Sequence, residues 1–242
     1  MKHLGLVFIA FVLFYYVSVE GIWSPYLCEI DINQTSPSFE YFMFVQQAPA
    51  AICLFTQCNK EYNENTKLWT IHGLWPSNPS NRYPEYCEPK PFDISSLSSI
   101  LLDMERYWPG FIKDSISFWS HEWCKHGTCS SSVNLLNTQY KYFKTVLDMY
   151  EKYNYETILK NSGIVPSSTV EYDIHDFHQA FLSSINVTAF FQCNKTTEMQ
   201  YQIIYQIAVC FDKQLMPISC GNMSAKENNT CDESHKVHYE IP

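Results

Sequence analysis

The chain has 242 residues and a formal net charge of -9, from 16 Lys and Arg against 25 Asp and Glu. So acidic a protein is not expected to coat a polyanion by general electrostatic attraction, and any action on nucleic acid would need local cationic groups. The length suits a single domain, and after the first residues no stretch of the sequence is long and apolar enough to cross a membrane.

The first residues have the pattern of a secretory signal peptide. Lys2 and His3 form a short basic head, followed by an apolar run at 4–17 and then by small residues. The run is too short to be a membrane span. We therefore expect residues 1–21 to be a signal peptide and residues 22–242 to be the mature domain of a secreted protein.

The cysteines and asparagines agree with an oxidising compartment. All ten cysteines lie beyond the first 21 residues, and an even number in a secreted chain indicates five disulfides. Five asparagines stand in Asn-x-Ser/Thr sequons and are predicted glycosylation sites: Asn33, Asn186, Asn194, Asn222 and Asn228.

Hydrophobic periodicity then predicts the elements in chain order. A strand at 39–47 precedes a small loop between Cys53 and Cys58, a strand at 68–72 and a loop that extends to Pro91. Helices follow at 94–108, 134–153, 156–162 and 173–185. The last elements are strands at 189–191 and 202–211, a turn at Pro217 and an edge strand at 237–241. Without βαβ alternation the predicted class is α+β, an antiparallel sheet packed against several helices in one disulfide-stapled domain.

The stretch 118–129 carries the densest group of ionisable residues. On a helical wheel four of them fall within an arc of about 140°, namely His121, Glu122, Lys125 and His126. Trp123 and Cys124 point away from that face, toward a core, and Gly127 is expected to end the helix in the left-handed conformation. A solvated outer face is the alternative, but such faces are mostly Lys and Glu and seldom hold two histidines beside large aromatics.

A second stretch, 69–76, places His72 at the end of a predicted strand, directly before Gly73. A lone histidine here would more often be a buried one that is satisfied by a backbone carbonyl. Trp75 three residues on, and the histidines downstream, favour a functional site instead.

Cleavage of a phosphodiester by a neighbouring hydroxyl fits this set of residues. One neutral histidine takes the proton of the 2′-hydroxyl, and one protonated histidine gives a proton to the departing 5′-oxygen. A lysine and a hydrogen-bonding partner stabilise the extra negative charge, and aromatic rings stack on the bases of a single strand. This chemistry needs no metal.

The segments 71–76 (IHGLWP) and 121–129 (HEWCKHGTC) resemble the two active-site motifs of the ribonuclease T2 family. The resemblance extends over nearly the whole mature chain and is strongest to plant secreted ribonucleases, the self-incompatibility S-RNases and their S-like relatives. It implies a ribonuclease T2-like fold and a cofactor-free endoribonuclease that cleaves single-stranded RNA through 2′,3′-cyclic phosphates. We further expect a monomer without a membrane partner, extracellular or vacuolar, with a pollen partner in the case of an S-RNase.

The resemblance also assigns roles by motif position. His72 would be the general acid and His126 the general base. Phosphate binding and transition-state stabilisation would fall to His121, Glu122 and Lys125. The base pockets would be lined by Trp75, Phe118, Tyr83 and Gln47.

For the cysteines, the family pattern implies the pairs Cys53–Cys58, Cys87–Cys129, Cys193–Cys231 and Cys210–Cys220. Cys28 and Cys124 are left over. A bond between them is a hypothesis, which the helical wheel supports because it turns Cys124 away from the catalytic face.

Three rival functions are weaker. A zinc peptidase needs His-Glu-x-x-His, whereas His121 and His126 have one residue more between them. A cysteine hydrolase would use Cys124, which a disulfide explains better. The third is a catalytically weak secreted glycoprotein with a storage or recognition role. Among ribonucleases, the acidic charge favours an S-like role in phosphate scavenging, senescence or defence over self-incompatibility, whose determinants are typically basic.

Overall fold

The computed structural model describes residue 28 and the ranges 38–59, 69–79, 83–195, 201–220 and 230–240. The predicted signal peptide at 1–21 lies outside the described residues, as do the sequons at Asn33, Asn222 and Asn228. The other two sequon asparagines, Asn186 and Asn194, are exposed. None of the helices in the described ranges has the length and hydropathy of a membrane span.

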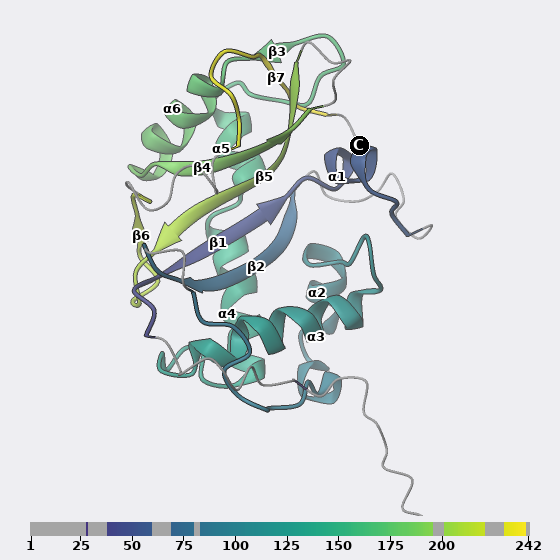
Figure 1. Ribbon diagram of the computed structural model, residues 1–242, viewed down its shortest axis with the longest axis vertical. Helices are drawn as coiled ribbons and strands as arrows, with labels where there is room; N and C mark the ends of the chain where they lie inside the picture. Colours follow the sequence, from purple (N-terminus) through teal and green to yellow (C-terminus); the bar gives the residue numbers. More distant parts are fainter. Residues whose placement is uncertain are drawn as a thin grey trace, which may run out of the picture.

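A mixed β-sheet forms the centre of the fold (Figure 1). Its main path has the order β2-β1-β5-β7-β3, and β4 and β6 also pair with β5. The strands are β1 (Tyr41–Gln47), β2 (Thr70–Ser77), β3 (Glu171–Tyr172), β4 (Ala189–Asn194), β5 (Gln202–Phe211), β6 (Pro217–Ile218) and β7 (Val237–His238). Among the described residues the strand pairs are antiparallel except β5 with β7, which is parallel, so the sheet is mixed where an antiparallel one was expected. The predicted α+β class is therefore confirmed.

The helices pack against this sheet. They are α1 (Pro49–Phe55), α2 (Leu101–Tyr107), α3 (Ser115–Lys125), α4 (Gln139–Lys152), α5 (Tyr155–Asn161) and α6 (Ile174–Ile185), with 3-10 turns η1 (Ile94–Leu97) and η2 (Gly127–Ser130). Figure 1 shows α4 passing behind β1 and β2, and α2 and α3 lying below β2. Two tyrosines of α4 tie it to β2, since the Tyr142 hydroxyl donates to the Leu74 carbonyl at 3.0 Å and the Tyr150 hydroxyl to the Trp69 carbonyl at 2.6 Å.

Capping residues explain where the longer helices begin. The side chain of Asp114 accepts a hydrogen bond from the Ser117 amide at the start of α3, and Thr138 does the same for α4. Asp173 and Asp176 form a reciprocal capping box on α6. These contacts satisfy amide groups that have no partner within the helix. The prediction that Asp173 begins a helix is confirmed.

Four predicted elements differ from the structure. The single helix expected at 94–108 is divided into η1 and α2 by a turn at 98–100. The strand that begins near residue 70 does not end at Gly73 but continues to Ser77, because β2 is an edge strand and an edge tolerates Pro76. The region of Pro217 forms a short strand, and β7 lies inside the sheet rather than at its edge. Helix α1 was not predicted, although Pro49 at its first turn is a helix-start signal.

Five disulfides join all ten cysteines. The pairs are Cys28–Cys124, Cys53–Cys58, Cys87–Cys129, Cys193–Cys231 and Cys210–Cys220. Two of these bonds attach other parts of the chain to the end of α3, at Cys124, and to η2, at Cys129. The motif at 121–129 lies here, so two disulfides attach it to the rest of the chain.

Candidate active site

His72 lies at a β-bulge in β2. Val45 of β1 faces Gly73 and Gln46 faces Ile71, so His72 is the extra residue in the register. A bulge turns a side chain away from the regular alternation of a strand, and bulges are common beside active sites. The position of the main chain is held by the Trp108 indole, which donates to the His72 carbonyl at 2.8 Å.

Helix α3 supplies the other predicted groups. His121, Glu122 and Lys125 lie in its last two turns, and His126 is the residue that caps its C-terminus. Trp123 and Cys124 are buried, as the helical wheel predicted.

The prediction that Gly127 ends the helix in the left-handed conformation is wrong. Among the glycines that the structure describes, positive φ is found at Gly163 and not at Gly127, and the chain continues into η2. The absence of a side chain is nevertheless required, since a Cβ at this position would lie 2.4 Å from Cε3 of Trp123. Gly127 therefore permits the close approach of the chain to the tryptophan ring.

The indole of Trp75 brings the two motifs together. Its ring lies 4.9 Å from the ring of His72, nearly at right angles, and 5.2 Å from the ring of His126, with the planes inclined by 29°. The indole N–H donates to Oε2 of Glu122 at 3.0 Å, and the other carboxyl oxygen lies 3.8 Å from Nε2 of His72. Glu122 is almost fully buried, with 1% of its surface exposed. Both imidazoles and the carboxyl group thus share one aromatic neighbour.

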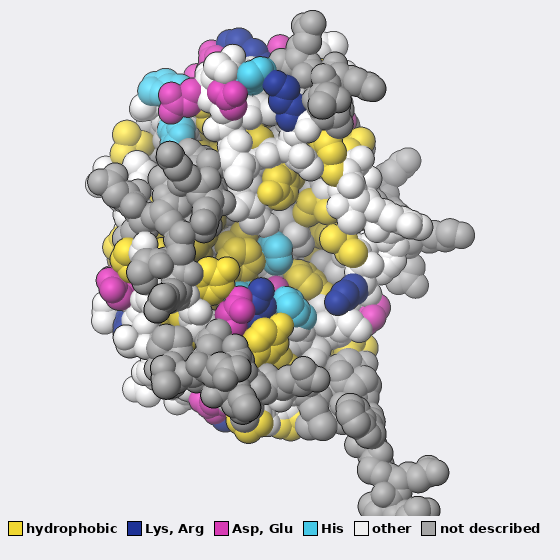
Figure 2. Space-filling model, viewed as in Figure 1, with side chains coloured by type: hydrophobic (Ala, Val, Ile, Leu, Met, Phe, Trp, Pro, Cys, Tyr) yellow, Lys and Arg dark blue, Asp and Glu magenta, His cyan; other side chains and the backbone are white. Residues whose placement is uncertain are grey.

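His121 and Lys125 lie nearer the surface. The ring of His121 is 6.4 Å from that of His126, and the ammonium group of Lys125 forms an ion pair with Glu85 at 3.0 Å. Figure 2 shows histidine, cationic and acidic side chains beside hydrophobic ones in the middle of this face, over β2 and α3. Glu85 lies outside the two motifs and is not among the residues predicted for the site. Its place two residues before Cys87, which is disulfide-bonded to Cys129, is the signal that could have found it.

Burial determines the charge state of the inner groups. It lowers the pKa of His72 to about 4, although a hydrogen bond to Gln206 works the other way, and it lowers the pKa of His126 well below its usual range. Burial also raises the pKa of Glu122 to about 8, against the hydrogen bond from Trp75 and the charge of Lys125. At neutral pH both imidazoles are therefore uncharged and Glu122 is protonated, so the contact between His72 and Glu122 is not an ion pair.

The outer groups respond to burial and to Glu85. Burial lowers the pKa of His121, as do the nearby charges of Lys125 and Lys113, while Glu85 opposes them. For Lys125 burial disfavours the ammonium form, but the hydrogen bond and charge of Glu85 exceed it and raise the pKa. Lys125 thus remains the permanent cation beside the two neutral imidazoles.

A pocket of about 240 Å³ opens beside His72. Four apolar and four polar or ionisable side chains line it, from β1, α1, β2, α3 and the segment before α3: Gln47, Ile52, His72, Phe111, Ile112, Lys113, Phe118 and His121. Of the residues predicted to bind bases, Gln47 and Phe118 therefore line this pocket. Trp75 lies against the two imidazoles instead, and the exposed Tyr83 lies close enough to influence the pKa of Lys125.

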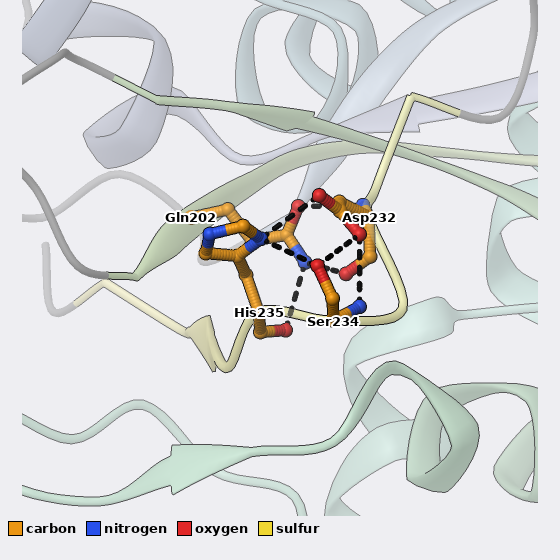
Figure 3. Close-up of polar contacts among 4 residues, drawn as sticks. All are labelled: Gln202, Asp232, Ser234 and His235. Carbon is orange, nitrogen blue, oxygen red and sulfur yellow. Dashed lines mark hydrogen bonds and ion pairs between the residues drawn. The ribbon is translucent and has the colours of Figure 1, made fainter.

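A second polar cluster precedes β7 and has a structural explanation (Figure 3). Nδ1 of His235 lies 2.8 Å from Oδ2 of Asp232 and 3.0 Å from the Ser234 hydroxyl. A hydrolytic triad places serine and carboxylate on opposite ring nitrogens, whereas here both meet the same one. The buried Gln202 amide bonds backbone groups of Asp232 and His235. The cluster therefore closes a turn onto β5.

Known proteins are similar to this chain in sequence and in fold. Residues 39–220 match the model of the ribonuclease T2 family. Ribonuclease Oy of Magallana gigas is 36% identical over 207 residues, which cover 83% of this chain and 96% of that protein. Extracellular ribonuclease LE of Solanum lycopersicum is 36% identical over 189 residues, which cover 76% of this chain and 80% of that protein.

A solved structure agrees with these relatives. The crystal structure of RNase NT in complex with 5′-AMP superposes with a TM-score of 0.73 at 31% identity, covering 84% of this chain and 99% of that one. Because animal and plant proteins both match, the relatives do not single out the plant subgroup. The chain therefore belongs to the ribonuclease T2 family and is a T2-type endoribonuclease.

Proposed function

We propose that the site cleaves single-stranded RNA by attack of the 2′-hydroxyl on the adjacent phosphate, which forms a 2′,3′-cyclic phosphate without a metal ion. The observation that carries this proposal is the pair of imidazoles, His72 and His126, which both contact the indole of Trp75. Two imidazoles in one site can supply both proton transfers of the reaction.

His126 is the general base in this proposal. Burial lowers its pKa well below the usual range, so the ring is neutral and ready to take the proton of the 2′-hydroxyl. The imidazolium that forms lies stacked on Trp75, and the face of an indole attracts a cation. The stacking therefore favours the charged product of the proton transfer.

His72 is the general acid. Its pKa of about 4 in the free protein rises when the substrate phosphate arrives, because a nearby opposite charge favours the protonated ring. His72 must be protonated and His126 neutral, so we expect an acidic to neutral pH optimum. A rate that climbs steadily through pH 9 would contradict this assignment.

Lys125, Glu122 and His121 stabilise the negative charge of the transition state. Lys125 supplies a full positive charge at the mouth of the site. Since the pKa of Glu122 is raised to about 8, its protonated carboxyl can donate a hydrogen bond to a phosphate oxygen. The pocket lined by Gln47 and Phe118 accepts an unstacked base, which only a single strand presents freely.

The test compares the mature, disulfide-bonded protein with its His126→Ala variant on single-stranded RNA in excess EDTA. We expect the wild type to release 2′,3′-cyclic phosphate ends and the variant to lose cleavage. Loss of wild-type cleavage in EDTA would refute the metal-free mechanism. Absence of cleavage under all conditions would favour the alternative, a secreted glycoprotein with a storage or recognition role.

We further propose that the protein is a secreted monomer, outside the cell or in the vacuole, with an S-like role in phosphate scavenging, senescence or defence. Five disulfides support an oxidising compartment, and the net charge of -9 supports the S-like role. A self-incompatibility S-RNase would instead meet a pollen partner. Allelic polymorphism and expression confined to the pistil would overturn the S-like assignment.

A further inference from the structure

Three glutamines cross the sheet side by side below His72. In the strand register Gln206 of β5 faces Gln47 of β1 on one side and Gln192 of β4 on the other. Cross-strand partners project from the same face of a sheet, so the three amides form a row. Gln47 belongs to the pocket described above, whereas Gln206 is buried behind the imidazole, with 6% of its surface exposed.

Two hydrogen bonds define how the Gln206 amide is oriented. The amide nitrogen of Gln206 donates to Oε1 of Gln192 at 2.7 Å, which leaves the Gln206 oxygen facing Nδ1 of His72, also at 2.7 Å. An amide oxygen only accepts, so Nδ1 of His72 must carry the hydrogen. The neutral ring is thereby held in the Nδ1–H form, with the lone pair of Nε2 directed to the site, 3.8 Å from Glu122.

We infer that Gln206 is a positioning residue, which selects the tautomer of His72 and holds Nε2 toward the departing 5′-oxygen. This inference rests on the proposed function, because it assumes that His72 is the general acid. Gln192 acts indirectly, through Gln206: its oxygen accepts from the Gln206 amide nitrogen, and the Gln206 oxygen therefore faces the ring of His72.

The chemistry of an amide suits this role. A carboxylate at the same place would bind the imidazolium strongly and make the proton harder to release, whereas a neutral oxygen orients the ring without adding charge. The titratable groups that face His72 come from α3 and its cap, namely His121, Glu122, Lys125 and His126. Among the described residues, the amides of this row come from β1, β4 and β5.

The experiment measures kcat and KM against pH for Gln206→Glu and Gln206→Met, with Gln214→Glu as a control that adds the same charge at an exposed turn. For Gln206→Glu we expect the alkaline limb of the profile to move up by about one pH unit, because an adjacent carboxylate favours the imidazolium. For Gln206→Met we expect the limb to move down and kcat to fall more than KM changes. The control should follow the wild type.

Alkaline limbs that stay in place in folded Gln206 variants would overturn the inference, since a merely structural residue would change activity equally at all pH values. If the variants do not fold, the nitrogen chemical shifts of His72 in the wild type report its tautomer. An Nε2–H tautomer would refute the inference. A His72→Ala variant separates the two claims. If that variant remains fully active, the proposed function fails as well; if it is inactive, only the role of Gln206 is at stake.

Discussion

Replacing Gly73 with alanine should disable the site while leaving the protein folded. A Cβ on this residue would lie 2.1 Å from Oε2 of Glu122 and 2.5 Å from the indole nitrogen of Trp75. Ordinary contact begins near 3.4 Å, so the carboxyl oxygen must move by about 1.3 Å and the indole nitrogen by about 0.9 Å. Both atoms belong to the hydrogen bond that joins the two motifs.

The two effects of Gly73→Ala have different sizes. Overpacking of this kind costs about 1–3 kcal/mol of unfolding free energy, which a chain with five disulfides can tolerate. Misplacement of reacting groups by about 1 Å costs on the order of 100-fold in rate. We therefore expect kcat/KM on a short RNA to fall about 100-fold while cooperative unfolding is retained.

The matched control is Gly163→Ala. Gly163 has φ of +79°, and among the described residues no atom outside its chain neighbours lies within 4 Å of an added Cβ, so alanine there is strained without a clash. This strain costs about 1–2 kcal/mol, close to the value expected for Gly73, yet it lies far from the chemistry. Both variants should unfold in urea at lower concentration than the wild type, and only Gly73→Ala should lose activity. A folded Gly73→Ala protein within threefold of wild-type kcat/KM would refute the reasoning.

Three further predictions concern stability. The pKa of His72 falls from 6.5 to about 4 on folding, so wild-type stability should decline as the pH drops from 6.5 toward 4. Urea unfolding of His72→Gln should show a shallower decline, and equal slopes of stability against pH in the two proteins would contradict this. The pKa of Glu122 rises from 4.5 to about 8 on folding, so its protonated carboxyl contributes fully to stability below pH 4.5, and this contribution is lost as the pH rises through 8. In the same urea assay, the stability of Glu122→Gln should therefore depend less on pH above pH 6 than that of the wild type. Replacing Cys28 and Cys124 together with alanine opens a span of 96 residues and should lower the unfolding free energy by about 4 kcal/mol, whereas a loss below about 1 kcal/mol would show that the bond constrains little.

Much of the candidate site could be predicted because its information is local. The spacing of residues on α3 determines which side chains share a face, and a helix repeats every 3.6 residues whatever its neighbours. The prediction that Trp123 and Cys124 point toward the core is thus confirmed. Capping chemistry is equally local, which is why the start of α6 at Asp173 was found from the sequence.

Most of the wrong predictions concern elements whose structure depends on residues far away in the chain. The break between η1 and α2 and the interior position of β7 depend on segments that periodicity within a window does not include. Gly127 is a different case, because the neighbour is local: glycine often ends a helix, but here the ring of Trp123, four residues earlier in the chain, is what excludes a side chain. Strand β2 continues through Pro76 because it lies at the edge of the sheet, and no other described strand there needs the missing amide hydrogen.

The sequence by itself therefore determined the residue types, the helix that carries His121, Glu122 and Lys125 and is capped by His126, and through its two motifs the family of the protein. Only the tertiary structure decided how these groups act on one another. The bulge at His72, the indole shared by both imidazoles and the amide of Gln206 all join residues that are far apart in the chain. Burial and strand register create those contacts, and with them the altered pKa values, because both depend on the packing of the whole fold.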